Sequence, residues 1–198
     1  MPEGFADWFP SRFAATFFIF AFYLWAACEL FNSWGFRRKR WLTSTQRSDR
    51  GSYWIILLVV WGSILISFLA RSHNLGIFHS NLQYLGLGLL VFGIVFREWA
   101  VLSLGSSFTV VVSTTSDQKL VKRGPYRWLR HPSYSGSMLT LVAFSLALGT
   151  WAGGLVVLVL SFAAYFYRVQ VEEKALLDIF GEEYRDYMQH TWRFFPGL

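Results

Sequence analysis

Five apolar stretches constrain the fold more than any other feature of this 198-residue sequence. A helix needs about 20 mostly apolar residues to cross a bilayer, within a usual range of about 17–25. The stretches cover residues 13–31, 53–70, 82–96, 133–148 and 151–167. The third and fourth are shorter than that range, so we expect them to start inside protein or to continue as helix beyond the apolar residues. Only two residues separate the fourth from the fifth, which predicts a tight helical hairpin.

The composition agrees with lipid as the main solvent of the chain. Hydrophobic residues make up 54% of it and charged residues only 15%, against about 25% in soluble domains. A chain of this length cannot bury so much apolar surface internally. Residues 1–9 contain no basic residue, so we expect no cleaved signal peptide. The predicted fold is therefore an all-α integral membrane protein with about five transmembrane helices, forming one membrane domain over residues 1–198.

Basic residues gather in the loops after the first and third apolar stretches. They are Arg37, Arg38, Lys39, Arg40, Arg47 and Arg50 in one loop, and Lys119, Lys122, Arg123, Arg127 and Arg130 in the other. The positive-inside rule places both loops in the cytosol, with the N-terminus outside and the C-terminus inside. The net charge of +6 then indicates orientation and contact with anionic lipid rather than nucleic-acid binding.

Several common kinds of site have no pattern in this sequence. The four histidines form no His-x-x-His or Glu-x-x-His pair, and Cys28 is the single cysteine, so we expect no zinc site. Gly86 and Gly88 lie inside an apolar stretch with no strand before them. Close helix packing explains them better than dinucleotide binding does.

Two groups of polar residues lie next to apolar stretches, one just before the fourth stretch and one just after the fifth. Pro132 suits the first turn of a helix, and His131 is then its cap, so the free amides of that turn could receive an anionic group. Arg168 and Glu172 share one helix face at the predicted membrane boundary, and Glu173 follows directly. The structural alternatives are a basic interface segment ending in a helix cap, and a snorkelling arginine with a local ion pair.

Beyond residue 168, an apolar residue recurs at every fourth position. These residues are Leu176, Phe180, Tyr184 and Met188. The spacing predicts an amphipathic helix, bent or broken at Gly181.

The two groups of polar residues together resemble a known family. The sequence Arg-His-Pro-Ser-Tyr-Ser-Gly at 130–136 is followed by Glu172-Glu173-x-x-Leu176-x-x-x-Phe180-Gly181-Glu182-Glu183-Tyr184-x-x-Tyr187, then by Arg193 and Pro196. This pattern resembles the isoprenylcysteine carboxyl methyltransferases, and the short chain is similar to the prokaryotic members. The resemblance covers about Leu120 to Pro196.

The resemblance implies a carboxyl O-methyltransferase that uses S-adenosyl-L-methionine and releases S-adenosylhomocysteine. It implies N-terminal transmembrane helices over 1–110 and a methyltransferase core over 111–198, which forms a cytosolic cofactor pocket. By motif, the cofactor-binding residues would be Gln118, Lys119, Leu120, Val121, Tyr126, His131, Pro132, Ser133, Tyr134 and Glu172. Arg168 matches the arginine that faces the substrate carboxylate, and is the expected catalytic and substrate-binding residue.

The residues suit such a reaction. An ionised carboxylate attacks a methyl carbon directly, so no general base is needed, and alignment with the reacting atoms about 3–3.5 Å apart is the main requirement. The expected partners are a lipid-modified small molecule or peptide as acceptor, together with membrane lipids, and we expect no metal. Three alternatives stay open: a phospholipid amine methyltransferase, a non-catalytic membrane scaffold, and a sterol-reductase-like NADPH enzyme whose basic groups would be Lys119, Lys122 or Arg123.

Overall fold

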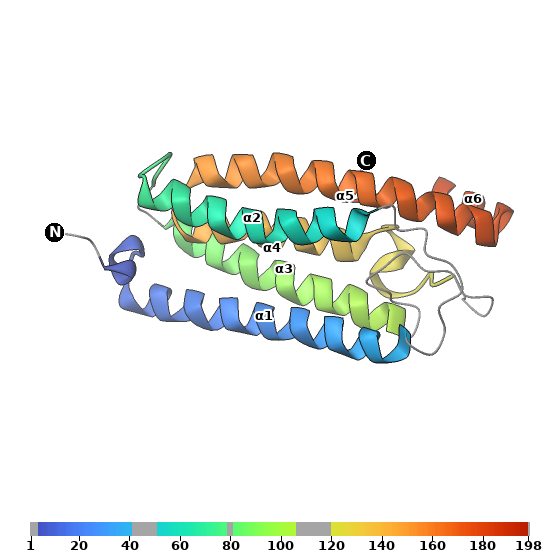
Figure 1. Ribbon diagram of the computed structural model, residues 1–198, viewed down its shortest axis with the longest axis horizontal. Helices are drawn as coiled ribbons and strands as arrows, with labels where there is room; N and C mark the ends of the chain where they lie inside the picture. Colours follow the sequence, from blue (N-terminus) through green and yellow to red (C-terminus); the bar gives the residue numbers. More distant parts are fainter. Residues whose placement is uncertain (1–3, 41–50, 79–80, 106–119, 198) are drawn as a thin grey trace.

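The computed structural model describes residues 4–40, 51–78, 81–105 and 120–197, with only the backbone for 33–40. Each of the five apolar stretches forms one helix, and a sixth helix follows near the C-terminus (Figure 1). The helices are α1 (Arg12–Arg40), α2 (Ser52–Ser72), α3 (Leu82–Leu104), α4 (Pro132–Ala147), α5 (Trp151–Phe180) and α6 (Glu182–Gln189). Two short 3₁₀ helices, η1 (Phe5–Trp8) and η3 (Gly124–Arg127), precede α1 and α4. The predicted all-α fold class is confirmed.

Four helices in the described part of the chain are long and apolar enough to span a membrane: residues 12–32 of α1, all of α2, all of α3 and all of α5. Helix α3 continues beyond the third apolar stretch, as expected, and α5 also continues beyond the fifth. Helix α4 is shorter, at 16 residues, and 12 of these are buried. Because neighbouring helices rather than lipid surround α4, it does not need the length of an independent span.

The long helices lie side by side along the molecule (Figure 1). The N-terminal η1 and the connections from α2 to α3 and from α4 to α5 lie at one end of the bundle. The start of α4, together with η3 and α6, lies at the other end. The polar motifs identified in the sequence are thereby gathered at a single end of the bundle.

The predicted hairpin and the predicted bend both depend on glycine. Gly149 has φ +83° between α4 and α5, and the Thr150 hydroxyl accepts a hydrogen bond from the Gly153 amide at 3.1 Å, which caps α5. Gly181 has φ +52°, ends α5 and immediately precedes α6. Left-handed backbone of this kind favours glycine, so both features were readable from the sequence.

Small residues allow α3 to approach α4 closely. A Cβ atom added to Gly86 would lie 2.6 Å from the Ala147 backbone nitrogen, and one added to Gly93 would lie 2.6 Å from the Thr140 hydroxyl. A Cβ atom on Gly88 would meet no atom within 4 Å. Of the two glycines attributed to helix packing, Gly86 has that role and Gly88 does not.

We predict that Gly86→Ala destabilises the protein by about 1–3 kcal/mol, because α3 and α4 must separate to admit the methyl group. Gly88→Ala in the same helix is the matched control, and should leave stability unchanged or raised by up to about 1 kcal/mol through helix propensity. Thermal unfolding in detergent measures both. Equal effects of the two substitutions would contradict the packing described here.

Candidate functional site

The C-terminal segment is paired with the segment that precedes α4. The amide of Arg130 donates to the Trp192 carbonyl at 2.7 Å, and the amide of His131 donates to the Arg193 carbonyl at 3.1 Å. In return, the Trp192 amide donates to the Trp128 carbonyl at 3.0 Å. These backbone hydrogen bonds bring together two motifs that lie about 60 residues apart in the sequence.

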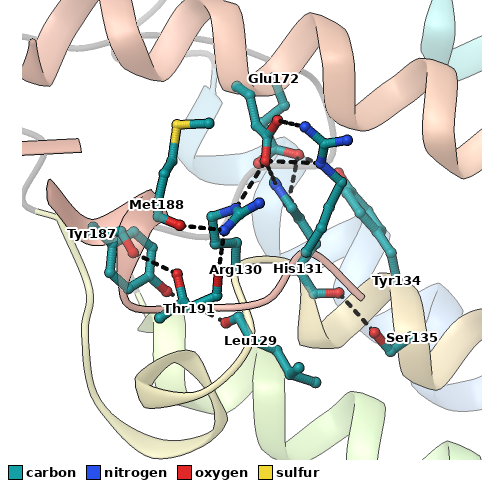
Figure 2. A network of polar contacts seen from close by, with 11 residues as sticks. Leu129, Arg130, His131, Tyr134, Ser135, Glu172, Tyr187, Met188 and Thr191 are labelled. Carbon is teal, nitrogen blue, oxygen red and sulfur yellow. Dashed lines mark hydrogen bonds and ion pairs between the residues drawn. The ribbon is translucent and has the colours of Figure 1, made fainter. Parts of the chain in front are cut away.

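Glu173 is the centre of a buried ionic network at this end of the bundle. One of its carboxylate oxygens accepts from Arg130 Nε at 3.0 Å and lies 3.3 Å from His131 Nε2. The other accepts from Arg193 Nη2 at 2.7 Å. The Glu173 side chain is only 7% exposed. In Figure 2 the side chains of Arg130 and His131 extend toward α5, and Arg130 also donates to the carbonyl groups of Met188 and Thr191. Glu173 therefore ties α5 to both motif segments.

The hydroxyl of Tyr134 connects Glu172 to Arg168. It donates to Glu172 Oε2 at 2.7 Å and accepts from Arg168 Nε at 3.3 Å. Arg168 Nη1 also donates to the Ser52 hydroxyl at 2.6 Å. His131 Nδ1 lies 3.7 Å from Glu172 Oε2. Arg168, the predicted substrate-binding residue, is thus joined through Tyr134 to Glu172. Both Tyr134 and Glu172 are predicted cofactor-binding residues.

Aromatic rings fix the position of Tyr134. Its ring stacks on that of His131, with centroids 5.7 Å apart and an interplanar angle of 8°. On α5, the Tyr165 ring stacks on it at 5.2 Å. A side chain held by two rings and two hydrogen bonds loses little further freedom when a ligand binds, which favours pre-organised recognition.

Tyr126 and Ser133 are buried close to this cluster. The Tyr126 carbonyl accepts from the Tyr187 hydroxyl at 2.5 Å. Burial raises the pKa of Tyr126 well above its usual range, so its phenol stays neutral. Leu120 and Val121 are half-buried just before η3. The two remaining predicted cofactor residues, Gln118 and Lys119, lie outside the described residues.

The expectation of free amides at the start of α4 needs a correction. His131 is the N-cap and Pro132 the first helical residue, as predicted. The His131 amide, however, is used by the Arg193 carbonyl, and the amides of Tyr134 and Ser135 both donate to the His131 carbonyl, at 3.1 and 3.2 Å. The tight first turn and the paired C-terminal segment therefore occupy two of the donors that the sequence left available for an anion, the amides of Tyr134 and His131.

A cavity of about 300 Å³ lies among the helices next to Arg168. Its apolar wall includes Trp25, Leu30, Ile56, Leu57, Val60, Trp61 and Leu141. Its polar lining residues include Glu29, Asn32, Arg97, Tyr134, Ser137 and Arg168. An apolar cavity that contains a few charged groups suits an amphiphile with a small polar head.

Sequence reasoning missed Glu29 and Arg97 as residues of this cavity. Glu29 is the single charge within the first apolar stretch, and Arg97 ends the third. An ionisable residue at membrane depth is costly and marks a candidate functional site. That signal was present in the sequence, but their common location became visible only in the fold.

Comparisons with known proteins confirm the resemblance recognised from the motifs. Residues 86–178 match the family model described as the isoprenylcysteine carboxyl methyltransferase (ICMT) family. The chain is 31% identical over 128 residues to a protein-S-isoprenylcysteine O-methyltransferase of Dictyostelium discoideum, covering 60% of this chain and 51% of that protein. It is 38% identical over 108 residues to the enzyme of the same name from Mus musculus, covering 54% of this chain and 38% of that protein.

A solved structure shares the fold. It is described as the eukaryotic intramembrane Ras methyltransferase ICMT, and it aligns with a TM-score of 0.57 and 29% sequence identity. The alignment covers 75% of this chain and 53% of the solved chain. This chain spans about half the length of most of the curated relatives it matches. The match to the family model covers most of α3, all of α4 and nearly all of α5.

We predict that Glu173→Gln lowers the free energy of unfolding by about 3 kcal/mol, because it leaves the partly buried guanidinium groups of Arg130 and Arg193 without their counter-charge. It should also expose the C-terminal segment after residue 189 to proteolysis. Glu182→Gln is the control, because that side chain is 83% exposed and its loss should cost no more than about 0.5 kcal/mol. Thermal unfolding and limited proteolysis would reveal the difference, and equal stability of both variants would contradict the role given to Glu173.

Proposed function

We propose that this chain is an isoprenylcysteine carboxyl methyltransferase, which methylates the carboxylate of a lipid-modified, prenylcysteine-like acceptor. One observation carries the proposal: a hydrogen-bonded connection from Arg168, which lines the apolar cavity, through Tyr134 to Glu172. A lipid acceptor and a polar methyl donor need different environments, and this connection joins two such environments.

The cavity is the proposed acceptor site. Its apolar wall suits a prenyl or acyl chain, since burying apolar surface stabilises binding by about 25 cal/mol per Å². Arg168 would orient the acceptor carboxylate by a charge-assisted hydrogen bond. Holding both oxygens would reduce their nucleophilicity, so we infer that one oxygen is held and the other stays free to react.

The proposed donor site lies on the other side of Tyr134. S-adenosyl-L-methionine supplies an electrophilic methyl group on a sulfonium centre when bound. The Glu172 carboxylate is 30% exposed and can pair with the ammonium group of that donor. Tyr126 is the aromatic ring proposed to face a cation, because the Tyr134 ring already stacks on His131 and Tyr165 and instead holds Glu172 through its hydroxyl. His131, Pro132 and Ser133 line the same region, with Leu120, Val121, Gln118 and Lys119 preceding it in sequence.

We also propose the topology expected from the basic loops. The end of the bundle that holds α6 and the donor site would face the cytosol, and η1 would face the opposite side. Residues 1–110 then form the N-terminal transmembrane helices, which supply most of the cavity lining, and residues 111–198 form the methyltransferase core. A phospholipid amine methyltransferase or an NADPH-dependent reductase would use the same end of the bundle, so the choice of ligand separates these functions.

Two substitutions should separate the two halves of the site. Glu172→Ala should abolish stabilisation by S-adenosylhomocysteine, because the partner of the ligand's ammonium is lost. Arg168→Ala should keep that stabilisation and lower turnover of a prenylcysteine analogue by about 100-fold, because the acceptor is misaligned. A thermal-shift assay measures ligand binding, since a ligand at 100 times its Kd stabilises the folded protein by about 2.7 kcal/mol. Transfer of a labelled methyl group measures turnover.

Arg127→Ala is the control for both measurements. Its guanidinium lies 4.9 Å from the Trp128 ring centroid, and the side chain does not line the cavity, so neither binding nor turnover should change. Stabilisation of the wild-type protein by NADPH alone would contradict the proposed function. Unchanged ligand binding in Glu172→Ala together with unchanged turnover in Arg168→Ala would contradict the residue assignment.

A further inference from the structure

The acceptor cavity contains a second guanidinium, Arg97, which already holds a carboxylate of the protein itself. Arg97 Nε lies 2.6 Å from Glu29 Oε1, and Arg97 Nη2 donates to Glu29 Oε2 at 2.8 Å. One hydrogen bond and one short ionic contact thus join the two side chains, and arginine binds a ligand carboxylate by the same charge-assisted chemistry. Both residues line the cavity, Glu29 from α1 and Arg97 from α3.

The two partners are held differently. Arg97 also donates through Nη1 to the Ser133 carbonyl at 3.4 Å and to the Ser137 hydroxyl, and its side chain is 13% exposed. These contacts with α4 would hold the guanidinium in place if Glu29 withdrew. The Glu29 side chain is 30% exposed. A carboxylate with that exposure can be resolvated at a lower cost than a fully buried one.

We propose that Glu29 is a specificity-determining residue: an internal carboxylate that an acceptor's own carboxylate displaces from Arg97. Arg97 and Arg168 then hold the same acceptor oxygen, which leaves the other oxygen free to react. This inference rests on the proposed function, because it takes the cavity to be the acceptor site. Exchanging one carboxylate for another keeps the positive charge of Arg97 paired throughout, so the exchange avoids the penalty of a buried unpaired cation.

The consequence is selection among amphiphiles by charge. A membrane offers many apolar chains with uncharged heads, and such molecules cannot replace the Glu29 carboxylate on Arg97. An acceptor with a carboxylate can replace Glu29 on Arg97. Its apparent affinity is then weaker than it would be if Arg97 had no internal partner to displace. Discrimination obtained by penalising the wrong partner in this way is a common route to specificity.

Glu29→Gln tests the inference through the sign of its effect. Glutamine keeps the length of the side chain and an oxygen that can accept from Arg97, but it removes the competing charge. We expect KM for a prenylcysteine carboxylate to fall by about fivefold, the upper end for a partly exposed ion pair, with kcat unchanged. The matched carboxamide analogue, tested as an inhibitor, should gain distinctly less affinity. If Glu29→Gln does not fold, Glu29→Asp should give a smaller fall in KM, because its shorter side chain reaches Arg97 less well.

Glu98→Gln is the matched control. Glu98 follows Arg97 on α3, accepts from Asn32 Nδ2 at 3.0 Å and does not line the cavity, so its loss should leave KM unchanged. A rise in KM or a fall in kcat for Glu29→Gln would mean that Glu29 only holds Arg97 in place. Either result, or an unchanged KM, would overturn this inference and leave the proposed function standing. A wild-type protein that methylates no carboxylate acceptor would overturn the proposed function, and this inference with it.

Discussion

The buried carboxylate of Glu173 is the interaction on which the arrangement of the site depends. Arg130, His131 and Arg193 all converge on it, from the segment before α4 and from the C-terminal segment. A buried charge of this kind is tolerated only when it is fully paired, and removing one partner is costly. The network therefore fixes the start of α4 against α5. It also places Tyr134, one turn into α4, beside Glu172.

Neighbouring acidic residues on α5 consequently have different roles. Successive residues on a helix differ in direction by about 100°, so Glu173 faces Arg130 and Arg193 while Glu172 faces Tyr134. Arg168 lies one turn before Glu172 on the same face and reaches the cavity. Helix α5 thus presents Arg168 toward the apolar cavity and Glu172 toward the polar cluster around Tyr134. Joining two such environments is what methyl transfer to a lipid carboxylate requires.

Much of the fold could be predicted from local patterns. Apolar stretches gave the helices, Gly149 and Thr150 gave the hairpin, Gly181 gave the break before α6, and Pro132 gave the start of α4. The family resemblance also held, because its motifs are short and lie close to helix ends. Each of these features depends on a few consecutive residues, whose chemistry is visible without the tertiary structure.

The contacts between distant segments could not be predicted in the same way. The pairing of Glu29 with Arg97 joins residues 68 positions apart, and the partners of Glu173 come from positions 130, 131 and 193. The expectation of free amides at the start of α4 was wrong for His131 for a similar reason, since its amide donates to the Arg193 carbonyl. Periodicity indicates which face of a helix is apolar but does not identify the neighbour that covers it.

The chemical nature of the product tests the central claim most directly. Purified protein in detergent or nanodiscs would be given S-adenosyl-L-methionine with a labelled methyl group, together with a prenylcysteine analogue and, separately, a phospholipid amine. The account predicts label in a base-labile methyl ester of the prenylcysteine analogue, with S-adenosylhomocysteine formed in equal amount. Label in a base-stable N-methyl product of the phospholipid amine, with none in the carboxylate acceptor, would contradict it.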